Sequence, residues 1–339
     1  QEEIALNLGN SLKVTLASEE RHPAAQSPNL PAYHLYLKAR YQANKRTRES
    51  LRKAVKLFEE AISTDPKYAA AYAGLAEACA LLASGGYETF GLDSLASQSK
   101  TAARQAVQLE PTFGEAHAAL ALVHFRLDWN WQSCEREFFI ACSLNPSFAT
   151  AHHWFALYLA ALGRLEEALE EIRRAEELDP LSLIIATAAA RILHFDRQYD
   201  AAVARCQKVL DLEPQFAEAH LDIGMAYLEK GDHPRAIHHL KKAVELSPER
   251  TLLVALLGHA YGRAEKKTAA SRVLRSLESG FHRALVLTGL GEDELAIEQL
   301  ERALQERSGQ IVYLKVEPIW TSLRSHPRFK KLLRVLRLI

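Results

Sequence analysis

A proline that returns at a nearly constant interval constrains the fold of this chain more than any other feature. Proline lacks a backbone donor and clashes with the preceding helical turn, so it ends one helix and can begin the next. The spacing therefore predicts a chain of similar helical units. Six such prolines follow a polar residue, at intervals of 45, 35, 34, 34 and 34 residues: Asp65-Pro66, Glu110-Pro111, Asn145-Pro146, Asp179-Pro180, Glu213-Pro214 and Ser247-Pro248.

Small and bulky residues recur at fixed distances before these prolines. Small side chains allow two helix backbones to approach, and a bulky side chain fills the space beside the crossing. Twelve residues before each proline stand Ala54, Ser99, Cys134, Ala168, Ala202 and Ala236. Five before stand Ala61, Ala106, Ala141, Ala175, Val209 and Ala243, and eight before stand Phe58, Ala103, Phe138, Ile172, Cys206 and Leu240, of which only Ala103 departs from a bulky pattern.

The period of 34 residues and these positions resemble the tetratricopeptide repeat (TPR), a helix-turn-helix unit. The resemblance implies an all-α TPR α-solenoid, a right-handed superhelix of antiparallel helix pairs, with about seven to eight repeats and terminal capping helices. We place the array at 31–280, with repeats at about 31–68, 69–113, 114–148, 149–182, 183–216, 217–250 and 251–280.

Two places interrupt the rhythm. The first interval holds about 11 extra residues, which we place near Ser84–Gly91 within an insertion from Ser84 to Ser99, and such insertions form loops or longer helix ends. Ala296 follows Ala270 by 26 residues instead of 34, which predicts a truncated eighth repeat at the start of 281–339.

The two ends are expected to cover the array. Residues 1–30 read as an amphipathic helix over 2–17 followed by a linker with three prolines, because Ile4, Leu8, Leu12 and Leu16 form one stripe. At the other end one helical face is apolar and the other is basic. We expect the apolar face to cap the solenoid; the alternative is a basic surface that touches a membrane or an acidic partner. The apolar residues are Phe329, Leu332, Leu333 and Leu336.

Two segments carry a narrower resemblance. Tyr33–Tyr41 leading to Phe58, and Tyr313–Pro318 continuing to Phe329, look like the TPR halves of large bacterial signalling proteins. In that family a winged-helix DNA-binding, serine/threonine kinase or nucleotide cyclase domain precedes the repeats. Gln1 at the start and a single methionine, Met225, agree with a piece of a longer gene product.

Composition limits the classes of partner. Forty-two basic and 42 acidic residues give a formal charge of zero and a pI near 7.4, so we expect no nucleic acid to bind this fragment. Apolar runs fall short of the roughly 20 residues of a membrane span. The four cysteines have no paired spacing and favour a reducing, cytoplasmic location; the alternative is the extracytoplasmic part of a tethered protein. Oligomeric state stays open.

No recognised catalytic or phosphate-binding motif occurs, so we expect no catalytic residue, no cofactor and no metal, and therefore no enzyme activity in this fragment. His117, His152 and His220 share one repeat position, which we interpret as structural. The aromatic Asp128–Trp131 turn is interpreted as packing between helices.

The remaining candidate is the concave groove that stacked first helices form. Positions 2, 5, 9, 12 and 13 of each repeat line it in TPR proteins, and these positions lack the lysines and asparagines of a carboxylate clamp. A peptide or helix with apolar anchors and some acidic character suits the lining. The candidate residues are Glu77, Leu122, Phe125, His153, Leu157, Arg191, His194, Met225, Glu229, His259 and Arg263.

We therefore expect a protein-protein interaction scaffold or regulatory module that binds a partner segment and relays its occupancy to an effector domain. Two alternatives stay open. The chain is the sensor region of a kinase or cyclase, or it is a small-ligand or lipid-binding TPR that uses the insertion around Tyr87–Phe90.

Overall fold

The computed structural model describes residues 29–84 and 91–339. The predicted helix over 2–17, most of the linker after it, and Tyr87–Phe90 lie outside the described residues. The described residues form 17 α-helices, a π-helical turn and two 3₁₀ helices, with no β-strand among them. The predicted all-α class is confirmed.

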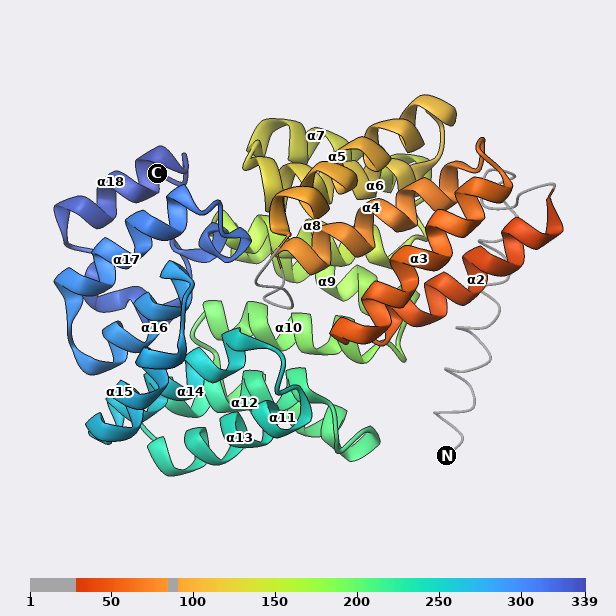
Figure 1. Cartoon of the computed structure of the whole chain (residues 1–339). Helices are drawn as coiled ribbons and strands as arrows, with labels where there is room; N and C mark the ends of the chain where they lie inside the picture. The colour runs from red at the N-terminus through yellow and green to blue at the C-terminus, as the bar shows by residue number, and fades with distance from the viewer. Residues whose placement is uncertain (1–28, 85–90) are drawn as a thin grey trace. The chain divides into compact units, whose positions relative to one another are not determined.

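The helices follow one another in pairs, and Figure 1 shows partners such as α2 and α3, or α12 and α13, side by side. The first pairs are α2 (Leu30–Asn44) with α3 (Arg48–Thr64), α4 (Ala69–Ser84) with α5 (Leu92–Leu109), α6 (Gly114–Val123) and its π turn η2 (His124–Asp128) with α7 (Trp131–Leu144), and α8 (Ala149–Ala161) with α9 (Leu165–Leu178). The later ones are α10 (Leu183–Phe195) with α11 (Tyr199–Leu212), α12 (Ala217–Glu229) with α13 (His233–Leu246), α14 (Thr251–Arg263) with α15 (Lys267–Ser276), and α16 (Gly280–Leu290) with α17 (Asp293–Gln305). The chain ends with η3 (Gly309–Tyr313), η4 (Pro318–Leu323) and α18 (Pro327–Val335).

The chain divides into two compact units. Unit 1 comprises the described residues up to Ala156 together with Glu170–Ser182, and unit 2 comprises Leu157–Leu169 and Leu183–Ile339. The division passes through α8 and α9. Each unit is described below by itself.

The residue before each proline makes the same turn in every pair. At the end of α3, for example, the Asp65 N–H donates to Ala61 O at 2.9 Å, and the Tyr68 N–H then donates to Asp65 O at 3.1 Å. The same two hydrogen bonds recur around Glu110, Asn145, Asp179, Glu213 and Ser247, although the second partner differs in side chain. Asp65 is extended, at φ −138° and ψ 92°, as a residue before proline prefers. The predicted helix breaks at the prolines are therefore confirmed.

The small residues lie at the helix crossings, as predicted. Ala54, Ser99, Cys134, Ala168 and Ala236 are fully buried, and Ala202 is 1% exposed. The bulky positions are buried as well, with Phe58, Phe138 and Leu240 at 0%. At Ala103, the exception in the pattern, a buried alanine fills the position. The recurring residues are thus the core of the helix pairs.

The interruptions of the repeat are distributed over helices. Helices α4 and α5 have 16 and 18 residues, against 13 and 14 in α12 and α13, so part of the extra sequence lengthens the helices. The shortening before Ala296 falls partly on α15, which has 10 residues and is followed by only three residues before α16.

Helix α18 buries the apolar face that the sequence predicted. Phe329 is fully buried and Leu332, Leu333 and Leu336 are at most 7% exposed. On the opposite face Arg328 forms ion pairs with Glu301 and Glu294. The helix contacts α17, so its apolar stripe is covered from within unit 2.

Two glycines set a close crossing of α14 and α16 in unit 2. A Cβ added to Gly289 would lie 2.4 Å from His259 O, and one added to Gly262 would lie 2.5 Å from the carbonyl carbon of Gly289. Both contacts are with backbone atoms, which cannot move aside as a flexible side chain could. The crossing therefore requires glycine at both positions.

We expect Gly289→Ala to lower the free energy of unfolding of unit 2 by about 2–3 kcal/mol, because overpacking forces the two helices apart. Gly231→Ala is the matched control. Gly231 has φ +78° but no atom within 4 Å of an added Cβ, so it bears only the left-handed backbone cost of about 1 kcal/mol. Urea denaturation followed by circular dichroism measures both, and an equal loss in the two variants would contradict the close crossing.

Candidate partner-binding surface

The predicted groove residues lie on the first helices of the pairs or, for Phe125, on the π turn after α6. Most of them are buried. Arg263 is exposed, and Arg191 and Glu229 are partly accessible. The buried residues are Glu77, Leu122, Phe125, His153, Leu157, His194, Met225 and His259. A partner therefore has direct access mainly to the three accessible residues, all of them in unit 2.

In unit 1 the predicted residues are engaged within the chain. The Glu77 carboxylate accepts hydrogen bonds from Arg46 at 3.1 Å and from Arg40 at 3.4 Å. Phe125 packs against the Trp131 ring, with centroids 6.1 Å apart. The pocket of unit 1 that includes Glu77 has a volume of about 10 Å³, hardly enough for one water molecule.

In unit 2 a charged pair links two successive first helices. Arg191 of α10 donates from Nε and Nη2 to Asp222 Oδ1 of α12, at 3.1 and 3.0 Å. Asp222 is 4% exposed. Burial raises the pKa of its carboxyl group, while the Arg191 charge opposes that shift. Arg191 is thus committed to a buried partner, although 31% of its side chain is accessible.

A segment near the C-terminus contacts the end of α10. His194 Nε2 lies 3.0 Å from Glu317 Oε1, and the Tyr313 ring packs against Phe195 with centroids 5.5 Å apart. Lys315 Nζ donates to Leu162 O at 2.7 Å. Burial alone would lower the pKa of His194, but the charge and hydrogen bond of Glu317 raise it. An acidic, partly apolar stretch of the chain therefore already binds to this part of unit 2.

Glu229 and Arg263 continue the polar surface. Burial raises the pKa of Glu229, and the charges of His194 and Arg263 oppose the shift. His259, one turn before Arg263, is fully buried and donates from Nδ1 to Leu285 O at 2.8 Å. Burial lowers the pKa of His259 to about 3. The neutral imidazole is therefore part of the core, and Arg263 is the accessible cation.

A pocket opens beside Arg263, also within unit 2. Its volume is about 560 Å³, and its walls come from the start of α13 and the turn between α14 and α15. The lining residues are His233, Pro234, Ile237, Arg263, Ala264, Glu265 and Lys266. Three cationic or ionisable nitrogen groups thus stand around apolar walls, with one carboxylate.

Sequence reasoning missed Asp222, Glu317, His233 and Lys266. A signal existed for Asp222, because an opposite charge 31 residues after Arg191 falls one helical turn before the equivalent position in the next repeat. Arg46 and Glu77 have the same separation. Glu317 had no local signal, because it lies 123 residues from His194.

The three histidines at one repeat position share a structural role, as their spacing suggested. Each ring lies against the carbonyl of the proline six residues earlier, with Nε2 at 2.9, 3.2 and 3.1 Å from the oxygens of Pro111, Pro146 and Pro214. A carbonyl only accepts, so Nε2 carries the proton in each. The other nitrogen faces the second helix of the pair: His117 faces Glu137, His152 faces Glu171 and His220 faces His239.

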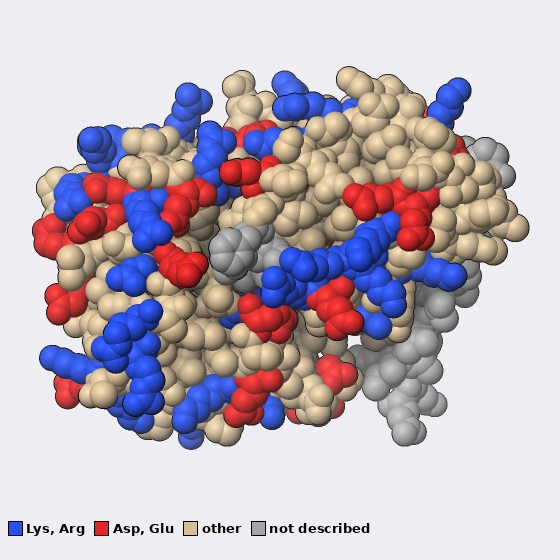
Figure 2. Space-filling view, in the orientation of Figure 1, with Lys and Arg blue, Asp and Glu red and all other residues tan. Residues whose placement is uncertain are grey.

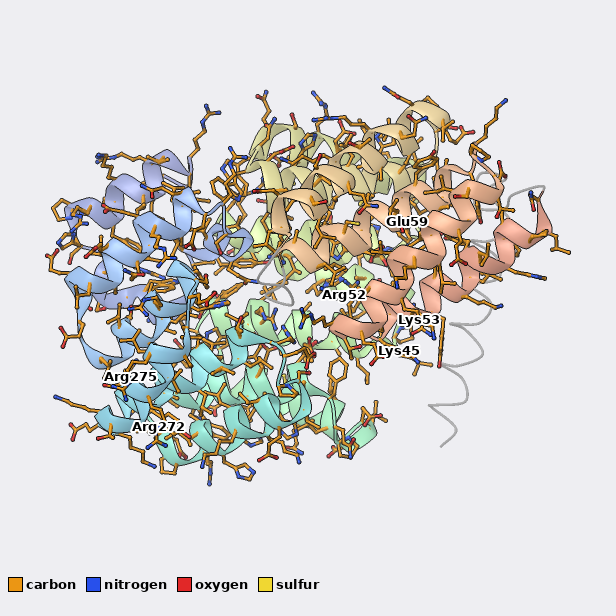
Figure 3. All side chains as sticks on the ribbon, viewed as in Figure 1. Lys45, Arg52, Lys53, Glu59, Arg272 and Arg275 are labelled. Atoms are coloured by element: carbon orange, nitrogen blue, oxygen red, sulfur yellow. The ribbon has the colours of Figure 1, made fainter. Side chains whose placement is uncertain are left out.

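Surface charge is mixed. Figure 2 shows blue and red side chains interspersed on the visible face, in agreement with the zero formal charge. Lys45, Arg52 and Lys53 gather near the start of α3, and Arg272 and Arg275 project from α15 (Figure 3). Arg272 is exposed and lines no part of the pocket beside Arg263.

Comparison with known families agrees with this geometry. Two profiles of the tetratricopeptide repeat match the chain, over residues 149–180 and 187–250. These ranges contain the helix pairs and the Xaa-Pro turns described above. The chain therefore carries tetratricopeptide repeats, and its fold is that of the TPR α-solenoids.

Individual relatives are similar over parts of their length. The BBSome complex member BBS4 of Bos taurus is 32% identical over 157 residues, which cover 45% of this chain and 30% of that protein. The transcriptional regulator HilA of Salmonella typhimurium is 24% identical over 246 residues, which cover 72% of this chain and 44% of HilA. The solved APC/C complex Cut9-Hcn1 has a TM-score of 0.60 at 18% identity, with coverage of 89% and 55%. This chain spans less than half the length of these two sequence relatives.

Among the helices of the described residues, none has the length and apolar character required to cross a membrane.

We expect Arg191→Leu to lower the free energy of unfolding by about 3 kcal/mol, because it leaves the buried Asp222 carboxylate without its cation. The double variant Arg191→Leu/Asp222→Leu is expected to regain most of that loss. Chemical denaturation at pH 7 measures both. If the double variant is as unstable as the single one, the cost does not come from the unpaired charge.

His282 predicts a pH dependence of unit 2. Burial lowers its pKa to about 4, below the value of about 6.5 in the unfolded chain. The unfolded state therefore binds more protons below pH 6.5, and stability falls as the pH decreases from there toward 4. At pH 5 this loss amounts to about 2 kcal/mol. Relative to wild type, His282→Gln should therefore gain about that much between pH 7 and pH 5 in denaturation experiments. A constant difference would contradict a neutral buried imidazole.

Proposed function

We propose that this chain is a protein-interaction module that binds an acidic segment with apolar anchors on unit 2. The observation that carries the proposal is the pocket of about 560 Å³ in which Arg263, Lys266 and His233 surround apolar walls. Cations beside apolar surface suit a peptide that offers a carboxylate and an adjacent apolar side chain. The TPR fold, common among interaction scaffolds, supports this choice over catalysis.

The chain itself offers an example of the recognition. Tyr313 packs on Phe195 while Glu317 binds His194, so an aromatic anchor and an acid four residues later bind to α10. A partner peptide with the same combination would use Arg263 and Lys266 as its cations. Glu265 is the one acidic side chain in the pocket lining, and it disfavours a basic partner.

We predict that acidic-apolar peptides selected from a displayed library bind the full chain, and that Arg263→Ala and Lys266→Ala each weaken binding about tenfold, the loss of one charge-assisted hydrogen bond. Fluorescence anisotropy with labelled peptides measures the affinity. Arg272→Ala is the matched control, because it removes an exposed arginine outside the pocket. Equal binding of peptides with Gln in place of Glu, or an unchanged affinity of Arg263→Ala, would rule out this pocket.

The similarity to HilA, over 72% of this chain, favours a second level of function. We propose that the module belongs to a larger bacterial signalling protein and reports partner binding to an effector domain. A regulator is favoured over a kinase or cyclase because HilA is a transcriptional regulator. The complete coding sequence tests this directly: a DNA-binding domain is expected, and a catalytic domain would replace the regulator by an enzyme.

A further inference from the structure

Three potential metal ligands meet on three consecutive helices of unit 1. Cys142 lies on α7, His152 on α8 and Glu171 on α9. Cys142 Sγ is 3.8 Å from His152 Nδ1, which is 2.6 Å from Glu171 Oε2. The three donor atoms lie within 4.8 Å of one another, and in the described part of the chain this is the one such group of three.

The orientation of His152 directs a lone pair at the other two donors. Its Nε2–H is committed to Pro146 O at 3.2 Å, so Nδ1 is the nitrogen that can coordinate. An Nδ1 lone pair and a carboxylate oxygen at 2.6 Å repel each other unless a proton or a cation lies between them. The pair therefore requires a positive charge at this point.

The other repeats show what is particular about this one. His117 and Glu137 form the same pair, at 2.7 Å, but Arg136 binds the second oxygen of Glu137. Four residues before the proline, where Cys142 stands relative to Pro146, the chain has Val107. In the repeat of His220 that position is Leu210. Of these three repeats, only that of His152 adds a sulfur donor.

We propose that Cys142, His152 and Glu171 bind a divalent transition-metal ion of the zinc class. Sulfur, imidazole and carboxylate are established zinc ligands, and three protein ligands leave a fourth tetrahedral position for water or a partner group. Zinc-ligand distances of about 2.0–2.3 Å imply ligand separations of about 3.3–3.6 Å. The S···N separation already approaches this range.

The remaining adjustment falls on Glu171. Its oxygen must move away from Nδ1 by a few tenths of an ångström, and its side chain is 27% exposed, so it has room to rotate. Burial raises the pKa of the Cys142 thiol to about 12, so coordination releases the thiol proton together with any proton shared by His152 and Glu171. The bound ion would join two adjacent repeats through α7, α8 and α9.

The test is a Co²⁺ titration of the metal-free full chain under reducing conditions, because Co²⁺ substitutes for zinc and a Co²⁺-thiolate bond gives a near-ultraviolet charge-transfer band. We expect one Co²⁺ per chain, with the band displaced by Zn²⁺. Cys142→Ser and Cys142→Val should abolish the band. His152→Gln and Glu171→Gln should weaken the affinity at least tenfold.

The matched controls are His117→Gln and Glu137→Gln, which alter the equivalent pair without sulfur and should leave the titration unchanged. Circular dichroism establishes that each variant is folded, and Cys142→Val carries the side chain that the preceding repeat tolerates. The absence of a charge-transfer band in the wild-type chain, or its persistence in both folded Cys142 variants, would overturn the proposal and leave His152 and Glu171 as an ion pair.

Discussion

The turn at each Xaa-Pro dipeptide is the constraint on which the rest of this structure depends. Its two backbone hydrogen bonds, such as those of Asp65 and Tyr68, end one pair of helices and begin the next in a single geometry. Because proline donates no hydrogen bond, its carbonyl is fixed in place beside the following helix, where a histidine six residues later can reach it. Regular turns thus determine the crossings that demand alanine and the positions at which polar groups can be buried.

The fold could be predicted because the information for it is local and repeated. A proline period, small residues such as Ala54 and Ala236, and bulky ones such as Phe58 specify a helix pair within about 34 residues. The same register located candidate groove positions but not their exposure. Exposure depends on neighbours from other repeats and from remote segments, and a pattern within one repeat contains no information about them. His194 is the clearest case, because Glu317 comes from 123 residues later.

Burial of the predicted groove residues also has a local cause. First helices such as α4 and α6 are rich in alanine, with Ala76 and Ala118 fully buried, so adjacent helices pack closely and leave little volume between them. Longer polar side chains at these positions then meet partners within the chain, as Arg191 meets Asp222. What stays accessible is found where helices end, and Arg263 and Lys266 stand at such a place.

The shared histidine position shows how one scaffold supports different chemistry. The repeat fixes one ring nitrogen on a proline carbonyl, and the partner of the other nitrogen is a single residue of the second helix: Glu137, Glu171 or His239. Burial and the charge of His220 lower the pKa of His239 to about 4, whereas the Glu137 hydrogen bond outweighs burial and raises the pKa of His117. A single substitution in the second helix therefore reverses the proton affinity of the site while the fold stays the same, which is why the period of this sequence predicts its architecture and not the chemistry of each repeat.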